Sequence, residues 1–279
     1  MLKRLSKSKA LVACHDAGAA NQILYLTHAL DNVEYLLEGP AKSIAVQLGI
    51  VFREDINAIN IEEYGVILCG SNTKLRVSDQ VLLLARQKGI QTIGFLDNWS
   101  GYRDRWKVHP DMIIAGDLYA LFQGFFIFGF KIRFLKSRYL GWLKDERDQM
   151  HLEQNSDETI LIVLQPIGMN YSHSENLNTC ICGYFLKSAR VQSYPYVLLR
   201  QHFSTPALNC LKYLTKEFPQ ISFSLTGPNS SLIEDLIRVS LVIGIDSYAL
   251  YVAKRLGYSV KTISASKWSA RHPNYRKFM

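Results

Sequence analysis

The sequence has few cysteines and no long apolar segment, and both shortages exclude classes of protein. Its five cysteines, among 279 residues, are odd in number, and Cys180 and Cys182 are too closely spaced for a zinc ribbon. We therefore expect reduced thiols in a cytoplasmic protein, without a structural metal. The apolar run GFFIFGF, residues 124–130, is too short to span a bilayer.

Two strong nucleotide-binding signatures are also missing. The sequence contains neither a GxGxxG motif nor a Walker lysine motif. Its beginning is basic and lacks an apolar stretch, so we expect no signal peptide. With 48% hydrophobic and 20% charged residues the chain is not disordered, and its length allows two domains of ordinary size.

The chain carries a formal charge of +8, and part of that excess forms one internal cluster. The cluster contains six cations: Lys131, Arg133, Lys136, Arg138, Lys144 and Arg147, of which the first four are the candidates for membrane contact. Phe134, Tyr139 and Trp142 are interleaved with them, a combination typical of membrane-surface contact. Two interpretations stay open: peripheral contact with an anionic membrane, and a partly buried helix whose basic face is solvated. Nucleic-acid binding is not expected, because the charge does not follow one sheet or helix face.

Short apolar runs alternate with helical apolar spacing along the whole chain, which predicts parallel sheets. Strands are expected at residues 9–14, 33–37, 66–69, 91–96, 112–115, 159–164, 196–199, 221–225 and 241–243. A polar stretch at residues 144–158 separates two similar halves. We therefore predict an α/β protein with two Rossmann-like parallel-sheet domains, residues 1–150 and 156–279, that face a cleft.

The most informative stretch is LVIGIDSYALYVAKRLGYSVKTIS, residues 241–264. It predicts a strand, a tight turn, a helix with Ser247 as its N-cap, and a second strand after Gly257. The N–H groups and the positive dipole end of such a helix favour a phosphate or carboxylate, although an ordinary capped turn has the same pattern. Arg200 and His202, two apart at another strand end, are further candidates for holding a phosphate.

Polar side chains also follow two strands of the first half. His15 and Asp16 come after the first strand, and either is a candidate general base, whereas Asp16 as a simple helix cap is the alternative. Because successive residues of an extended chain point in opposite directions, we expect only one of the two to face the cleft. The strand at 91–96 is followed by six residues that are candidates for sugar or nucleotide recognition, or alternatively form a salt-bridged surface loop: Asp97, Asn98, Trp99, Tyr102, Arg103 and Arg105.

Several of these segments together resemble the GT-B superfamily, which includes many glycosyltransferases and the nucleotide-sugar 2-epimerases and hydrolases. They are HDAGAAN, LDNWSGYRDRW, RQH, TGPNSS and LVIGIDSYALYVAKRLGYSV, and the resemblance covers nearly all of the chain. It implies a C-terminal nucleotide-sugar donor domain, with His202, Gly227, Asp246 and Ser247 near the nucleotide and phosphate. It also implies an N-terminal acceptor domain, with its site near Asp16, Asp97 and Trp99.

The resemblance further implies a metal-independent glycosyltransferase of bacterial cell-surface polysaccharide synthesis, without a cofactor, that acts on a glycan or lipid-linked acceptor. Two alternatives stay open. One is a nucleotide-sugar hydrolase or 2-epimerase with a base at His15. The other is a non-catalytic nucleotide-sugar-binding subunit that docks on a membrane enzyme through residues 131–142. We expect a cytoplasmic protein, either free or peripheral at the inner face of the plasma membrane.

Overall fold

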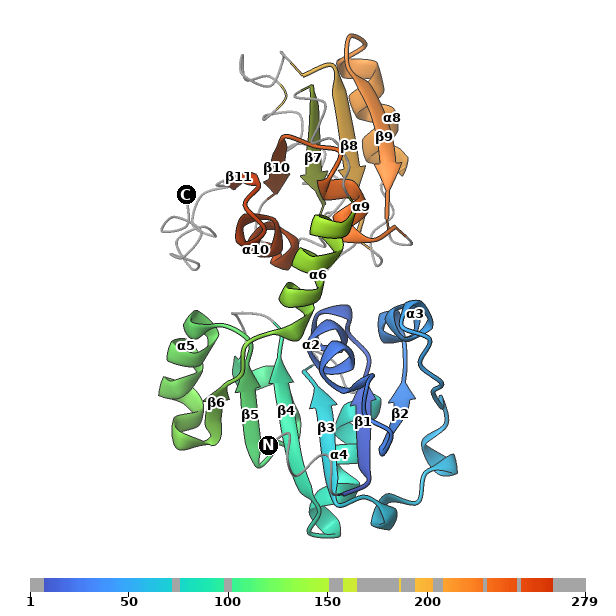
Figure 1. The fold of residues 1–279 in the computed structure, drawn as a ribbon, viewed down its shortest axis with the longest axis vertical. Coiled ribbons are helices and arrows are strands. Elements are labelled where there is room, and N and C mark those ends of the chain that lie inside the picture. The colour runs from blue at the N-terminus through green and yellow to red at the C-terminus, as the bar shows by residue number, and fades with distance from the viewer. Residues whose placement is uncertain are drawn as a thin grey trace. The chain divides into compact units, whose positions relative to one another are not determined.

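The structure is a computed structural model that separates into two compact units, unit 1 (Met1–Trp142) and unit 2 (Leu143–Met279). Each unit is described by itself (Figure 1). The residues that the structure describes are 8–71, 76–97, 102–150, 158–164, 186, 194–202, 208–227, 230–244 and 247–262.

Unit 1 contains one parallel sheet in the order β2-β1-β3-β4-β5-β6. Its strands are β1 (Ala10–Cys14), β2 (Val33–Leu37), β3 (Val66–Gly70), β4 (Gln91–Leu96), β5 (Met112–Ala115) and β6 (Ile132–Phe134). Its helices are α2 (Ala17–Thr27), α3 (Pro40–Gln47), α4 (Val77–Gln87) and α5 (Leu118–Phe128), with 3-10 turns η1 (Ile56–Ala58), η2 (Ile61–Glu63), η3 (Tyr102–Asp104) and η4 (Gly129–Lys131). β1 and β3 are buried along their whole length, which is why they are continuously apolar.

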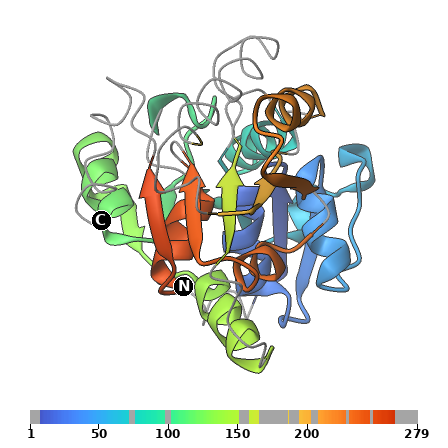
Figure 2. The ribbon, with the colours of Figure 1, turned by 90° about the horizontal axis from the view of Figure 1, so that it is seen from above.

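Unit 2 contains a second parallel sheet in the order β11-β10-β7-β8-β9. Its strands are β7 (Thr159–Val163), β8 (Tyr196–Arg200), β9 (Ser222–Thr226), β10 (Leu241–Gly244) and β11 (Ser259–Thr262). Its helices are α8 (Leu208–Glu217), α9 (Leu232–Leu236) and α10 (Tyr248–Arg255), and α6 (Arg138–Gln149) spans the division between the units. Figure 2 shows yellow-green β7 beside the red strands from the end of the chain.

The predicted fold class is confirmed, because both sheets are parallel and helices alternate with strands. The segment around the basic cluster differs from the expectation of a single helix. Residues 132–134 form the edge strand β6, and α6 begins at Arg138 and continues into the polar stretch. Aromatic packing stabilises the first turns of α6. The Tyr139 ring lies 4.9 Å from the Tyr25 ring, and the Trp142 ring lies 4.7 Å from it. No helix among the described residues is long and apolar enough to cross a membrane.

Candidate functional site

Each sheet has one point where the strand order reverses, and ligands of open α/β sheets bind outside the carboxyl ends of the strands at such points. In unit 1 the reversal lies between β1 and β3, so the residues that follow Cys14 and Gly70 are at the expected place. In unit 2 it lies between β7 and β10, so the start of α10 is at the expected place. The two carboxyl edges are therefore the candidate sites.

The first candidate site contains a contact between His15 and Asp16. Asp16 occupies the N-cap position of α2, but its side chain accepts no capping hydrogen bond, so the capping alternative is wrong. Its Oδ1 lies instead 2.6 Å from Nδ1 of His15. The expected divergence of the two side chains is wrong as well, because the extended strand ends at Cys14 and the chain turns into α2.

The environment of Asp16 raises the pKa of its carboxyl above the ordinary value. Burial is the main cause and the nearby Asp97 adds to it, whereas the hydrogen bond with His15 acts in the opposite direction. The Asp16 side chain is 28% exposed, so one face of the carboxylate is accessible. A carboxylate whose pKa is raised and whose orientation is fixed by a histidine has the properties of a general base.

Gly39 fixes the other side of the His15 ring. Its φ of +52° favours glycine, and a Cβ at this position would lie 2.5 Å from Nε2 of His15. The ring is thus held between the Asp16 carboxylate and the backbone at the end of β2. It can therefore orient Asp16 with little freedom of its own.

Asp97, directly after β4, is the centre of a buried polar cluster. Its Oδ1 accepts hydrogen bonds from Ser71 Oγ (2.6 Å) and Arg105 Nη1 (3.1 Å), and its side chain is 11% exposed. A Cβ at Gly18 would lie 2.8 Å from Asp97 Oδ2, so the small residue lets the carboxylate approach the first turn of α2. Asp97 is therefore held beside Asp16 by a salt bridge with Arg105 that is buried and not on the surface.

Apart from Arg105, the residues predicted around Asp97 are not brought into this cluster by any described contact. Arg103 lies on η3 and is exposed, while Asn98 and Trp99 lie outside the described residues. Arg105 belonged to the predicted group and does contact Asp97, whereas Ser71 is a member that the prediction did not place in the site. The neighbouring Trp106 donates its indole Nε1–H to the Gly70 carbonyl (3.0 Å), which holds this segment against β3.

In the second candidate site, in unit 2, the charge of Arg200 is paired with a carboxylate of the same unit. The Arg200 guanidinium is ion-paired with Asp235 on α9, which is buried, and it donates to Ser230 Oγ at 3.2 Å and to the Ser230 carbonyl at 3.0 Å. Ser230 Oγ in turn accepts the Gly227 N–H at 2.8 Å. Arg200 therefore shapes the loop after β9, in which Gly227 has a φ of +64°.

His202 follows β8 and is partly buried. Burial lowers the pKa of its imidazole to about 4, so the ring is neutral at pH 7. A neutral imidazole recognises a phosphate oxygen by donating a hydrogen bond and not by its charge. With Arg200 paired to Asp235, the start of α10 is a further source of positive potential among the described residues of this edge.

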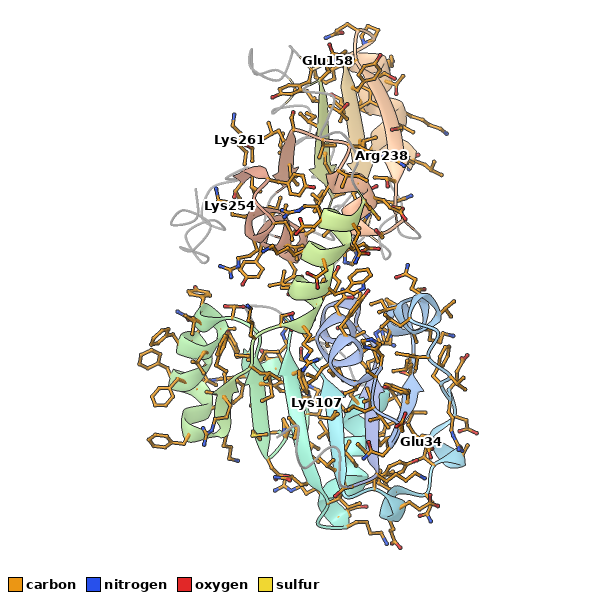
Figure 3. All side chains as sticks on the ribbon, in the orientation of Figure 1. Glu34, Lys107, Glu158, Arg238, Lys254 and Lys261 are labelled. Carbon is orange, nitrogen blue, oxygen red and sulfur yellow. The ribbon has the colours of Figure 1, made fainter. Side chains whose placement is uncertain are left out.

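Ser247 is the N-cap of α10, as predicted, and its Oγ accepts the Ala249 N–H at 3.2 Å. α10 buries Leu250, Val252 and Ala253, and it ends before Gly257, whose φ is +93°. Lys254 extends from its last turn, where a cation suits the negative end of the helix dipole (Figure 3). Asp246 lies outside the described residues.

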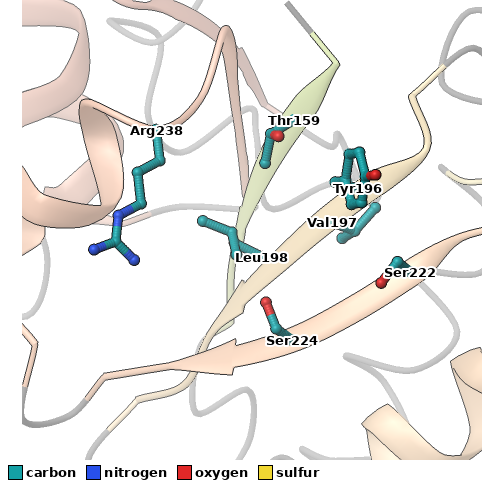
Figure 4. A pocket seen from close by; sticks show the side chains of 7 residues that line it. All are labelled: Thr159, Tyr196, Val197, Leu198, Ser222, Ser224 and Arg238. Carbon is teal, nitrogen blue, oxygen red and sulfur yellow. The ribbon is translucent and has the colours of Figure 1, made fainter. Parts of the chain in front are cut away.

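Unit 2 also has a cavity of about 240 Å³ that lies away from the carboxyl edge. It is lined by residues from the amino-terminal halves of β7, β8 and β9 and by one arginine (Figure 4): Thr159, Tyr196, Val197, Leu198, Ser222, Ser224 and Arg238. Since ligands of parallel sheets bind at the opposite ends of the strands, this cavity is not one of the two candidate sites.

No protein-family model and no curated protein matches the sequence. Solved structures do match the fold. The UDP-GlcNAc 2-epimerase of Methanocaldococcus jannaschii in complex with UDP-GlcNAc and UDP has a TM-score of 0.69 at 10% identity, over 96% of this chain and 86% of that one. The chain has a GT-B-type fold.

Two further solved structures with a GT-B-type fold are similar to this chain. S. aureus MnaA, solved with UDP, has a TM-score of 0.67 at 10% identity over 97% of this chain and 82% of that one. The Neisseria meningitidis UDP-GlcNAc 2-epimerase bound to UDP-GlcNAc has a TM-score of 0.65 at 11% identity over 96% and 85%. At such identities the likeness is one of fold, and it covers both units.

Proposed function

We propose that the protein is an enzyme that acts on a nucleotide sugar, and that it is a glycosyltransferase. The observation that carries this proposal is the Asp16–His15 pair at the switch point of unit 1, where a carboxylate of raised pKa is not used as a helix cap. Sites at which a carboxylate is oriented by a histidine are suited to deprotonating a hydroxyl. The fold supports the nucleotide-sugar part of the proposal, because solved proteins that share it bind UDP or UDP-GlcNAc.

In this proposal the donor binds at the carboxyl edge of unit 2. The start of α10 at Ser247, the neutral His202 and the loop at Gly227 hold the diphosphate, with Asp246 beside them. Arg200 positions the loop through Asp235 and Ser230. The positive end of the helix dipole stabilises the diphosphate as it leaves, so neither a metal nor a cofactor is required.

The acceptor hydroxyl binds at unit 1, near Asp97, Asn98, Trp99 and Arg103. Its proton moves to the Asp16 carboxylate, its oxygen forms a bond with the anomeric carbon of the sugar, and the bond from that carbon to the diphosphate oxygen breaks. His15 holds the Asp16 carboxylate during this transfer. We propose a glycan or lipid-linked acceptor of the bacterial cell surface and a cytoplasmic location.

A second candidate function is 2-epimerisation or hydrolysis of the nucleotide sugar without an acceptor. The observation that favours it is that the solved structures with this fold include UDP-GlcNAc 2-epimerases from two organisms. In that reaction the base of unit 1 acts on the sugar itself or on water. The two candidates differ in whether the nucleotide sugar is converted when no acceptor is present.

The experiment is an incubation with UDP-, GDP-, CMP- and dTDP-sugars, with and without membrane-lipid and oligosaccharide acceptors, followed by ³¹P and ¹H NMR. A glycosyltransferase releases the nucleotide rapidly only with an acceptor, whereas an epimerase or hydrolase converts the sugar without one. Asp16→Asn should lower the rate by roughly 10²–10⁴-fold. Asp104→Asn, an exposed acid on η3, is the matched control and should retain activity. Nucleotide-sugar binding without any turnover would instead indicate a non-catalytic subunit.

A further inference from the structure

Helix α5 presents most of its large apolar side chains outward. The residues fully buried along it are small, Ala120 and Gly124, and a Cβ at Gly124 would collide with Ile132 of β6. Leu121 and Phe128 are partly buried and pack against the core of unit 1. By contrast, Phe122 is 65% exposed and Phe126 is 85% exposed, and in Figure 3 side chains of α5 project away from the sheet of unit 1.

The exposed side chains of α5 and its neighbours form one continuous surface. Phe122 and Phe126 are one helical turn apart and therefore share a face. The Phe125 ring lies 6.3 Å from the Phe126 ring and 5.6 Å from the Phe130 ring, which extends the surface past the end of the helix. We call this surface the α5–β6 patch; its exposed apolar members are Leu118, Phe122, Phe125, Phe126, Ile127, Phe130 and Phe134. Apolar surfaces of this kind mark interaction sites.

The charged side chains in the segment that carries the α5–β6 patch have one sign. The sequence from Leu118 to Lys144 contains no aspartate or glutamate. Four exposed cations accompany the patch: Lys131, Arg133, Lys136 and Arg138. Within the described residues none of the four forms an ion pair with a carboxylate. Arg133 donates to the Phe130 carbonyl, which places its guanidinium at the margin of the patch.

This charge distribution selects among the occupants that an apolar surface can have. A second copy of the chain, joined by a two-fold axis through the patch, would bring the same cations close to one another. A lipid bilayer that carries anionic headgroups offers phosphates to the cations and an apolar boundary to the phenyl rings. The combination therefore favours a membrane surface over self-association.

We propose that the α5–β6 patch docks the protein on an anionic bilayer, with Phe126 and Phe130 entering the interface and the four cations contacting lipid phosphates. This inference does not depend on the proposed function. It is consistent with a lipid-linked acceptor, because docking would hold the enzyme at the surface where such an acceptor lies. Of the aromatic side chains interleaved with the basic cluster, Phe134 is exposed and belongs to the patch, whereas Tyr139 is buried against Tyr25.

The test is co-sedimentation of the full chain with vesicles of phosphatidylcholine alone and of phosphatidylcholine mixed with phosphatidylglycerol. We expect binding to the mixed vesicles that weakens with salt. Phe126→Ser with Phe130→Ser should reduce the partition coefficient on the order of tenfold per ring. Lys131→Ala with Lys136→Ala should reduce it roughly fivefold per cation.

Two matched controls keep the result specific to the patch. Lys212→Ala with Lys216→Ala removes the same net charge from α8, and Val51→Ser with Leu83→Ser removes exposed apolar side chains elsewhere on unit 1. Both controls should bind as the unmodified protein does, and circular dichroism should show that all variants are folded. Equal binding to both vesicle types, equal losses in the controls, no vesicle binding, or a dimer that Phe126→Ser with Phe130→Ser dissociates would each overturn the proposal.

Discussion

The carboxyl edges of the two sheets use their charged side chains differently. In unit 1, Asp97 is ion-paired with Arg105, and the neighbouring Asp16 has a raised pKa and a side chain that is 28% exposed. In unit 2, Arg200 is ion-paired with Asp235, burial keeps His202 uncharged, and Ser247 caps the start of α10. This difference is the basis of the division of tasks that we propose, with proton transfer at unit 1 and binding of a negatively charged leaving group at unit 2.

The largest expected loss of stability follows from breaking the ion pair between Arg200 and Asp235 at the carboxyl edge of unit 2. Asp235→Asn leaves the largely buried Arg200 guanidinium without its carboxylate and should lower the free energy of unfolding by about 3 kcal/mol. Urea unfolding followed by circular dichroism measures this loss. Glu234→Gln, at the exposed neighbouring position, should cost far less. Equal losses in the two variants would show that the pair does not hold the edge.

The second prediction concerns how the free energy of unfolding responds to acid, which differs between the two carboxyl edges. The pKa of His202 is about 4 in the folded state and near 6.5 in the unfolded chain, so the unfolded chain binds a proton first as the pH falls. The free energy of unfolding should therefore decrease by about 2 kcal/mol between pH 7 and pH 5, or less where solvent screens the partly exposed ring. His202→Gln should remove this part of the pH dependence. If its pH profile matches that of the unmodified protein, His202 does not carry the effect.

Unit 1 offers a comparison between two glycines in the left-handed region. Gly39→Ala places a Cβ against His15, whereas Gly89, with a φ of +66°, has open space around the added atom. Both variants carry the backbone strain, and Gly39→Ala should lose roughly 1–2 kcal/mol more because the His15 ring must move. Thermal unfolding of the two variants in parallel gives the difference. Similar melting temperatures would contradict the close contact between Gly39 and His15.

The smallest expected change in stability comes from Asp16. As the pH falls, Asp16 should stabilise the folded state, whereas His202 should destabilise it. Because the pKa of Asp16 is raised on folding, ionised Asp16 destabilises the folded state, and this cost disappears when the pH falls below the ordinary value of 3.8. Asp16→Asn should therefore be slightly more stable than the unmodified protein at pH 7, with the gain vanishing near pH 4. Melting temperatures across this pH range measure the gain. A variant that is less stable at pH 7 would show that Asp16 is a structural residue.

Local patterns in the sequence were sufficient for the fold. Buried parallel strands are apolar along their length, so runs such as VILCG of β3 predict their own positions. The N-cap at Ser247 and the capping box of Ser231 with Glu234 depend on residues within one turn, and both are present. Such features need no knowledge of the rest of the chain.

The details of both sites depend on partners that are distant in sequence. Ser71 and Asp97 are 26 residues apart, and Arg200 and Asp235 are 35 residues apart. Spacing alone cannot show that Arg200 is paired inside unit 2. For the same reason, the apolar sequence of α5 did not show that its phenyl rings are exposed, because the small face at Gly124 packs on a strand that follows later in the chain.

The division of tasks is tested most directly by thermal unfolding with UDP, GDP, CDP and dTDP in three proteins: the unmodified chain, Asp16→Asn and Ser247→Trp. We predict that one nucleoside diphosphate raises the melting temperature of the unmodified chain, by about 2.7 kcal/mol of stability at a hundredfold excess over its Kd. Asp16→Asn should show the same shift, and Ser247→Trp should show none. A shift that is lost in Asp16→Asn and kept in Ser247→Trp would contradict the account.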